Sequence, residues 1–127
     1  MTTATSTMST RAIAARLAEL CRKGDFETAQ KELYAKDAVS IEPYATDDFE
    51  KETKGLDKML EKGEKFQSMV EAIHGPVEIS DPVFAENSFA FSMTMDMTMK
   101  QKGRMKMSEL CVYEVKDGKI ISEQFFM

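Results

Sequence analysis

The sequence is poor in several residue types, and each shortage excludes a class of site. It contains no tryptophan, two cysteines and one histidine, His74. A single histidine cannot build a histidine-based metal site, and the distant Cys21 and Cys111 form neither a Cys-x-x-Cys motif nor a disulfide framework. The chain also lacks a glycine-rich phosphate loop and a Gly-x-Ser-x-Gly motif. We therefore expect neither a metal nor another cofactor.

Charge and hydropathy exclude two further kinds of partner. The net charge of −5 argues against nucleic acid, because phosphate binding depends on clustered lysine and arginine. No apolar run approaches the about 20 residues that cross a membrane. With 127 residues, 43% of them hydrophobic, the chain suits one globular domain whose core needs no metal or disulfide.

The first ten residues differ in composition from the rest of the chain. Residues 1–10 are rich in serine and threonine and have neither the basic start nor the apolar block of a signal peptide. We therefore expect a disordered lead-in over 1–10, a single domain over 11–127 and a location in the cytoplasm.

Hydrophobic spacing divides the domain near residue 70 into a helical half and a β-rich half. Apolar residues at helical spacing predict helices over 11–23, 26–34 and 56–70, with a short strand over 38–42. Gly63 lies on the apolar face of the third helix at a cost of about 1 kcal/mol relative to alanine, so we expect close packing against a sheet there. Alternating residues then predict strands over 77–86, 89–100, 104–116 and 119–126. The fold class is α+β, with three helices packed on an antiparallel meander.

The turns between the last three strands set a pairing register. The first turn places Lys100 opposite Arg104, and the Asp117-Gly118 turn places Val115 opposite Ile120. Because side chains alternate between the two faces of a sheet, the helices must cover the methionine-rich face. That face carries Phe89, Phe91, Met93, Met95, Met97, Met99, Met105, Met107, Val115, Ile120 and Phe126. Its polar members are Glu109, Tyr113, Ser122 and Gln124, with the thiol of Cys111.

A carboxyl group beneath the helices needs an explanation. A buried carboxylate without a partner costs several kcal/mol or takes up a proton. Glu109 therefore either belongs to a fixed polar network or lies in an apolar pocket with its pKa raised toward neutrality, where it serves proton transfer. The sequence leaves both interpretations open.

The opposite face of the sheet is too apolar at one end to be simply solvated. Leu110, Val112, Ile121 and Phe125 form an apolar patch of a kind that monomers seldom leave exposed. We expect a homodimer that pairs through this face.

Short motifs along the chain occur in an order that one known family shares. They are Gly24-Asp25-Phe26, the segment from Leu33 to Val39, Glu42-Pro43, Lys54-Gly55 and the segment from Val115 to Ile120. With them the chain resembles the nuclear-transport-factor-2-like (NTF2-like) superfamily, in its SnoaL-like and ketosteroid-isomerase-like branch. The resemblance implies a cone, in which a strongly curved sheet wraps around three helices and encloses a pocket, often in a homodimer.

The resemblance also implies roles for single residues. Ketosteroid isomerases use an aspartate before the proline that closes the first strand as the general base, and this position is Glu42 here. Their oxyanion-binding tyrosine falls on Leu17, so that donor is missing. Their protonated aspartate falls near Leu110 or Cys111, neither of which is acidic, and Glu109 lies close by as a substitute.

These residues support two hypotheses about function. In the first, Glu42 acts as a base, with Glu109 or Tyr113 as a donor, in isomerase, cyclase or dehydratase chemistry on a small apolar compound. In the second, the protein is a non-catalytic module that binds a hydrophobic ligand or only assembles as a dimer. The residues expected to contact the ligand are Leu17, Met93, Met95, Cys111 and Gln124.

Overall fold

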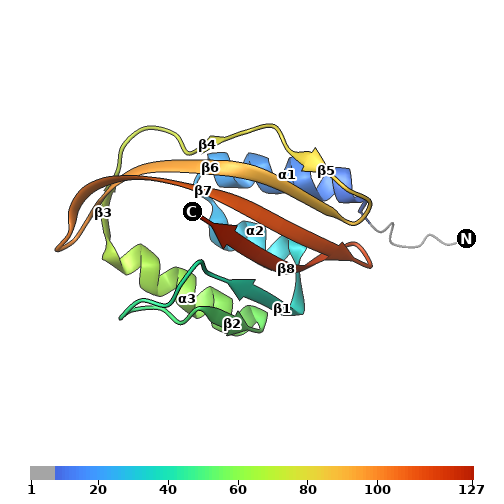
Figure 1. Ribbon diagram of the computed structural model, residues 1–127, viewed down its shortest axis with the longest axis horizontal. Helices are drawn as coiled ribbons and strands as arrows, with labels where there is room; N and C mark the ends of the chain where they lie inside the picture. Colours follow the sequence, from blue (N-terminus) through green and yellow to red (C-terminus); the bar gives the residue numbers. More distant parts are fainter. Residues whose placement is uncertain (1–7) are drawn as a thin grey trace, which may run out of the picture.

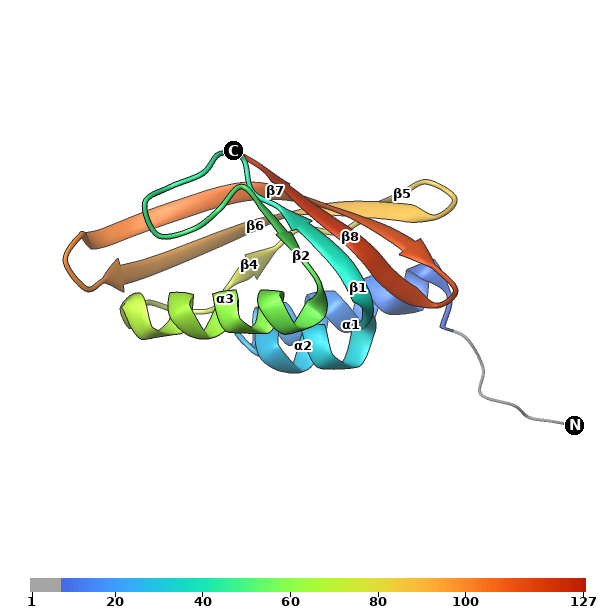
Figure 2. The same ribbon diagram turned by 90° about the horizontal axis from the view of Figure 1, so that it is seen from below.

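Three helices lie on one side of a curved sheet, as Figure 2 shows. The computed structural model describes residues 8–127, and within them the helices are α1 (Thr10–Arg22), α2 (Phe26–Leu33) and α3 (Leu56–Met69). The strands of the sheet are β1 (Tyr34–Ile41), β2 (Glu52–Lys54), β3 (Val70–Ile73), β4 (Glu78–Ile79), β5 (Val83–Phe84), β6 (Ser88–Met99), β7 (Gly103–Lys116) and β8 (Lys119–Phe126). The α+β class predicted from the sequence, with three helices packed on a curved sheet, is confirmed.

The N-terminal boundary is set by a helix cap. The hydroxyl of Ser9 accepts a hydrogen bond from the Ala12 backbone N–H, and Thr10 begins α1. The rest of the expected lead-in, residues 1–7, lies outside the described residues. None of the helices in the described part of the chain is long and apolar enough to span a membrane, and the cytoplasmic location stays a prediction.

The sheet is mixed, whereas the sequence indicated an antiparallel one. Its strands follow the order β2-β1-β8-β7-β6-β3, and β4 and β5 pair with β6. The pairing of β1 with β8 is parallel, while the other pairs are antiparallel. Figure 1 shows how β6 and β7, the longest strands, cross the whole molecule and extend beyond the helices at the hairpin end. The long curved strands therefore form the wall against which the helices pack.

The register between β6 and β7 differs by two residues from the predicted one. Met99 pairs with Gly103 across a turn at residues 100–102, and Met93 pairs with Glu109. Gln101 and Gly103 both have positive φ here, and the three-residue turn lies one residue earlier in the chain than the predicted turn at 101–103. A shift of two residues leaves each side chain on its original face. The methionine-rich face is therefore turned toward the helices, as predicted.

A bulge in β8 makes the predicted register of that strand wrong. Val115 pairs with Ile120 as expected, but the next pair joins Glu114 to Ser122, so one residue of β8 is extra. Beyond this β-bulge the alternation is inverted, because one inserted residue moves all later side chains to the other face. Glu123 and Phe125 consequently turn inward, while Gln124 shares the outer face with its partner Val112 and Phe126 is exposed.

The inner face of the sheet and the helices form one hydrophobic core. Tyr113 is fully buried, and its ring stacks on that of Phe89 with centroids 4.9 Å apart. From the helices, Ile13 and Leu17 of α1, with Leu33 of α2, are almost wholly inaccessible. The helices therefore dock by the apolar stripes that the sequence predicted for the first two.

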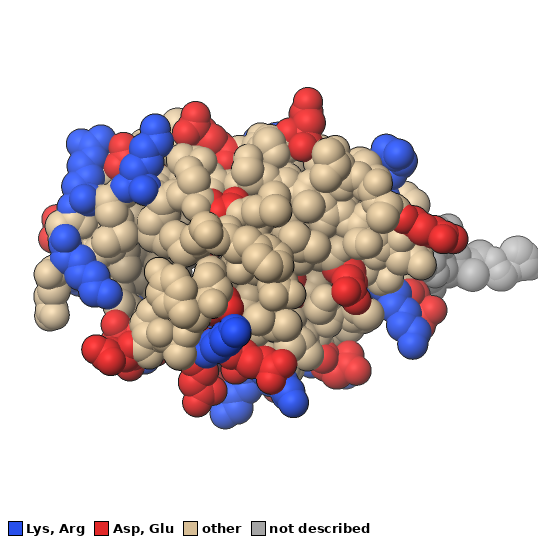
Figure 3. Space-filling view, in the orientation of Figure 1, with Lys and Arg blue, Asp and Glu red and all other residues tan. Residues whose placement is uncertain are grey.

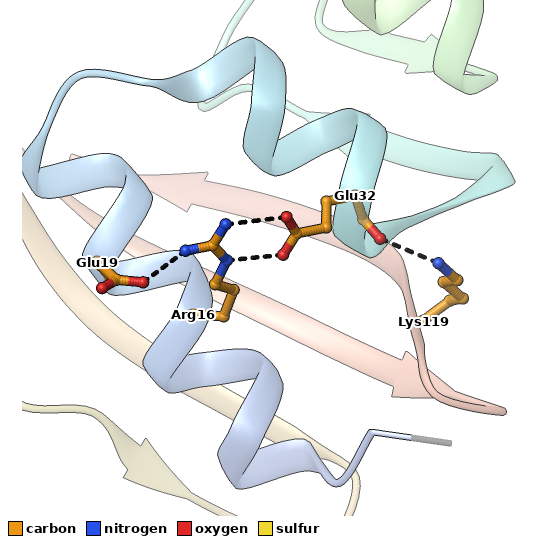
Figure 4. A network of polar contacts seen from close by, with 4 residues as sticks. All are labelled: Arg16, Glu19, Glu32 and Lys119. Atoms are coloured by element: carbon orange, nitrogen blue, oxygen red, sulfur yellow. Dashed lines mark hydrogen bonds and ion pairs between the residues drawn. The ribbon is translucent and has the colours of Figure 1, made fainter. Parts of the chain in front are cut away.

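An ionic network ties the first two helices together on the surface, as Figure 4 shows. The Arg16 guanidinium donates two hydrogen bonds to the Glu32 carboxylate, at 2.7 and 3.0 Å, and one to Glu19 at 2.6 Å. Lys119 at the start of β8 donates to the Glu32 carbonyl oxygen. Because all these groups are exposed, the network orients α1 and α2 but contributes little to stability.

The outer face of the sheet carries an apolar patch that differs in one member from the prediction. Leu110 and Phe126 are 45% and 46% exposed, and Phe126 takes the place expected for Phe125 because of the bulge. In Figure 3, where this side faces the reader, the middle is largely uncharged, and lysine and arginine gather at the β6–β7 hairpin end. Dimer formation through this face stays a prediction.

Candidate functional site

A cavity of about 490 Å³ lies between the helices and the inner face of β6 and β7. Phe26, Phe66 and Phe125 contribute aromatic surface to it. The remaining apolar wall consists mainly of methionines, which are flexible and polarizable and so adapt to the shape of a ligand. These methionines are Met59, Met69, Met93, Met95, Met99, Met105, Met107 and Met127.

The cavity opens to solvent beside the loop between β1 and β2. Tyr44 of this loop and Met127 at the C-terminus line the cavity and are 60% and 63% exposed. The loop is tied at its base, where the backbone N–H of Glu42 donates to the Lys51 carbonyl oxygen at 2.7 Å. A ligand can therefore enter at this end without opening the core.

A chain of polar contacts crosses the wall where β1, β8 and α3 meet. The Lys62 ammonium of α3 donates to a carboxylate oxygen of Glu42 at 2.9 Å and to the hydroxyl of Ser40 at 3.0 Å. Ser40 donates in turn to Glu123 at 2.7 Å, and the Tyr34 hydroxyl donates to the other oxygen of Glu123. Every carboxylate and hydroxyl of this chain therefore has a partner, as buried polar groups require.

Local structure explains how these groups meet. Tyr34 caps the end of α2 and begins β1, Ser40 follows on the same strand, and Glu42 comes directly after the strand, two positions beyond Ser40. The parallel pairing of β1 with β8 brings Ser40 beside Glu123, which the bulge has turned inward. Burial raises the pKa of the Glu123 carboxyl, against the opposing effect of the hydrogen bonds from Tyr34 and Ser40.

Glu109 is the acidic group on the β7 wall of the cavity. Its pKa is raised to about 7, chiefly by burial and also by the nearby Glu42 and Glu123 carboxylates, while the Lys62 ammonium acts in the opposite direction. Its cross-strand neighbour is Met93, so its surroundings on the sheet are apolar. At neutral pH Glu109 is divided between its protonated and ionised forms, which suits a group that gives and takes protons.

The buried tyrosine and cysteine side chains in and behind the wall stay neutral. Burial raises the pKa of both Tyr34 and Tyr113 well above its usual value, so both hydroxyls keep their protons. Burial also raises the pKa of the Cys21 thiol to about 12 and that of Cys111 further, so neither thiol is a nucleophile at neutral pH. Both cysteines are free.

Most of the residues selected from the sequence lie on this cavity. Glu42, Glu109, Tyr113, Leu17, Met93 and Met95 all line it. Cys111 lies instead in the core with no exposed surface, and Gln124 faces away because of the bulge, so the prediction that Gln124 points inward is wrong. His74 is also elsewhere, with its Nε2 2.7 Å from the Thr98 hydroxyl. The catalytic and binding roles of the lining residues stay predictions.

The sequence did not indicate Lys62, Tyr34 and Glu123. Lys62 precedes Gly63 in α3, and nothing in the apolar spacing of that helix distinguishes it from the solvated lysines nearby. Tyr34 reads as the last apolar residue of a helix, and strict alternation assigns Glu123 to solvent. The carboxyl groups of Glu42, Glu109 and Glu123 thus lie around the single ammonium group of Lys62. Among residues 8–127, no group of three histidine, cysteine or acidic side chains could hold a metal ion.

Gly63 has a different role from the predicted one. A Cβ atom placed on it would meet no other atom within 4 Å, so the expected close packing against the sheet is wrong. Gly63 instead lines the cavity, and its missing side chain leaves space there.

The raised pKa of Glu109 predicts a pH-dependent difference in stability. Because the folded-state pKa of about 7 exceeds the unfolded value of 4.5, the stability associated with this carboxyl is complete below about pH 4.5 and is lost as the pH rises through 7. Glu109→Gln cannot ionise, so at pH 8 we expect its free energy of unfolding to exceed that of the wild type by on the order of 2–3 kcal/mol. Urea denaturation at pH 4 and 8 measures this; an equal difference at both values would contradict it.

Comparisons with known proteins agree with this architecture. A model of the SnoaL-like domain matches residues 8–127. A crystal structure from Mesorhizobium loti, provisionally described as a SnoaL-like polyketide cyclase, is 30% identical, with a TM-score of 0.84 over 94% of this chain and 100% of its own. A search of curated proteins finds no match.

More distant structures share the fold alone. An NTF2-like protein of unknown function from Burkholderia pseudomallei is 11% identical, with a TM-score of 0.76 over 94% of this chain and 92% of its own. A protein with a ketosteroid-isomerase-like fold from Catenulispora acidiphila, solved with trimethylamine, is 14% identical, with a TM-score of 0.70 over 91% of this chain and 84% of its own.

Proposed function

Because the chain belongs to the SnoaL-like domain family, as its motifs predicted, we propose that it binds a small apolar carbonyl compound in the methionine-lined cavity and transfers a proton on it. Glu109 is the proposed base. The single observation that carries this proposal is a carboxyl group with a pKa of about 7 on the wall of an open apolar cavity. The provisional description of the Mesorhizobium loti protein as a polyketide cyclase is compatible with such chemistry.

Proton abstraction needs a base that is ionised yet poorly solvated. An apolar wall weakens the hydration of the carboxylate. A pKa close to the working pH leaves a large fraction of the carboxyl groups ionised and still makes the carboxylate a strong enough base. Glu109 meets both conditions. Glu42 was the base expected from the sequence, but its carboxylate is already paired with Lys62 at 2.9 Å. This pairing favours Glu109 over Glu42 as the base.

The alternative is a binding module without chemistry. The adaptable methionine wall supports a binding module as well as it supports an enzyme. A binding module needs only the apolar surface and makes no use of the acidic group. The two functions differ in one respect: only the enzyme requires Glu109 to change its protonation state.

A general proton-transfer probe tests the proposal without the natural substrate. In 5-nitrobenzisoxazole a base takes the proton from C3, the C–H electrons complete a nitrile, and the N–O bond breaks to release a coloured phenolate. We expect the protein to accelerate this reaction, with a rate that rises with pH around a midpoint of about 7 as Glu109 ionises. The neutral fluorophore N-phenyl-1-naphthylamine should bind the cavity and inhibit competitively.

Two outcomes would overturn the proposal. A rate no higher than that of acetate at the same concentration would exclude proton transfer and leave the binding module. Failure of the fluorophore to bind would exclude the apolar ligand as well.

A further inference from the structure

Lys62 is a polar residue of the cavity wall with unused hydrogen-bonding capacity. Its side chain is 18% exposed and lines the cavity. An ammonium group has three N–H donors, of which one goes to Glu42 and one to Ser40. Among the described residues nothing accepts the third. One donor of a largely desolvated cation is therefore available to a ligand.

The buried end of the polar chain holds Lys62 in one orientation. Because an ammonium group only donates, the Ser40 oxygen must accept from it, which directs the Ser40 proton to Glu123. Tyr34 donates to the other carboxylate oxygen of Glu123. Ser40, Glu123 and Tyr34 are 0%, 4% and 6% exposed, so this anchor is rigid and shielded from water.

Among the residues that the structure describes, no other cation has a comparable position in the cavity wall. Lys102 also lines it but is exposed at the rim, where water screens its charge. Removing a proton next to a carbonyl leaves negative charge on the oxygen, and a preorganised donor in a poorly solvated site stabilises that charge strongly.

We propose that Lys62 is a further catalytic residue, which donates a hydrogen bond from its third N–H to the substrate oxygen on which negative charge develops when Glu109 removes a proton. Ser40 and Glu123 are positioning residues for it. This inference rests on the proposed function and narrows the substrate to compounds whose acidic C–H is conjugated to an oxygen acceptor. The proton moves from carbon to the Glu109 carboxylate, and the electron pair moves to the oxygen that Lys62 contacts.

The charged groups around Lys62 and Glu109 allow the Lys62→Met variant to distinguish two roles for Lys62. The titratable groups near Lys62 and Glu109 are Tyr34 of β1, Glu42 directly after it, Cys111 and Tyr113 of β7, Glu123 of β8 and Cys21 of α1. Tyr44 and Asp48 of the loop between β1 and β2, with Lys102 at the rim, also line the cavity. Since the Lys62 ammonium lowers the pKa of Glu109, its removal makes Glu109 a stronger base. If Lys62 acts only by lowering the pKa of Glu109, the rate in Lys62→Met should be higher once Glu109 is fully ionised. If Lys62 donates a hydrogen bond to the substrate oxygen, that rate should be lower.

We expect Lys62→Met to lower kcat for 5-nitrobenzisoxazole by about 10²-fold on the alkaline plateau, with the midpoint moved to higher pH. The loss should be greater for unsubstituted benzisoxazole, whose leaving oxygen carries more charge, and Lys62→Arg should recover part of the rate. Lys58→Met, an exposed lysine on the same helix, is the matched control. An unchanged or higher plateau in Lys62→Met would overturn the proposal.

The positioning role requires a separate variant. Glu123→Gln keeps the shape of the side chain and lowers kcat more than it raises KM if Glu123 orients Lys62. Circular dichroism and thermal unfolding show whether the variant is folded. An unchanged kcat in the folded variant would remove Glu123 from the mechanism.

A binding experiment tests Lys62 independently of turnover. In a Glu109→Gln background, which has no base at position 109, we expect the ratio of affinities for 4-nitrophenolate and the neutral 4-nitroanisole to fall about tenfold on adding Lys62→Met. A fall in this ratio without turnover in the wild type would support the oxygen site and refute the proposed reaction. An unchanged ratio would refute the oxygen site itself.

Discussion

Glu109→Gln should reduce the rate of 5-nitrobenzisoxazole breakdown by about 10²-fold or more, because positioned general bases contribute factors of about 10²–10⁴. The amide has the same shape as the carboxyl group but cannot accept the proton. The rate that remains should no longer change around pH 7, since the group responsible for that midpoint is gone. Stopped-flow absorbance of the released phenolate gives both the rate and its pH profile.

Two neighbouring glutamates serve as controls for this result. Glu114→Gln changes an exposed acid on the outer face of the same strand and should leave the rate unaltered. Glu42→Gln removes a charge that raises the pKa of Glu109, so it should move the midpoint to lower pH while catalysis persists. If Glu42→Gln abolished the reaction and Glu109→Gln did not, Glu42 would be the base, as the sequence suggested.

Filling the space beside Gly63 should separate stability from binding. Gly63→Ala should raise the free energy of unfolding by about 1 kcal/mol, because alanine is the better helix former and its methyl group meets no other atom. Gly63→Phe should weaken the binding of N-phenyl-1-naphthylamine by somewhat less than 10²-fold, since displacing about 100 Å² of apolar contact costs about 2.5 kcal/mol. Chemical denaturation and fluorescence titration measure the two effects.

The matched control places the same ring outside the cavity. Glu64→Phe adds it at the next position of α3, where the native side chain is exposed and not part of the lining. This variant should bind the fluorophore like the wild type. Equal weakening by Gly63→Phe and Glu64→Phe would show that the fluorophore binds elsewhere.

The sequence predicted which face of the β6–β7 hairpin is buried because face assignment depends only on whether a residue number is odd or even. The register was wrong by two residues, yet Met93, Met95 and Glu109 still face the helices. In β8 a single extra residue inverted the faces, and Glu123 replaced Gln124 on the inside. A β-bulge is decided by tertiary packing and sheet curvature, which two successive isoleucines do not reveal.

The polar chain escaped prediction for a related reason. Lys62, Ser40 and Glu123 come from α3, β1 and β8, and they meet only because β1 joins the sheet parallel to β8. Spacing along a single element carries no information about such a meeting. The family resemblance indicated Glu42 before Pro43, but nothing in the local pattern pointed to the lysine that pairs with it.

The two sides of the cavity differ in stiffness. Thioether side chains with three rotatable bonds cover the β6–β7 side and can repack around molecules of different outline. Opposite them, hydrogen bonds hold the Glu42, Lys62 and Ser40 side chains in fixed positions. A molecule bound between the two sides would have its reactive end held in a fixed position by the polar side chains, while the methionines adapt to hydrocarbon parts of different shape. The same polar groups could therefore act on a series of related compounds.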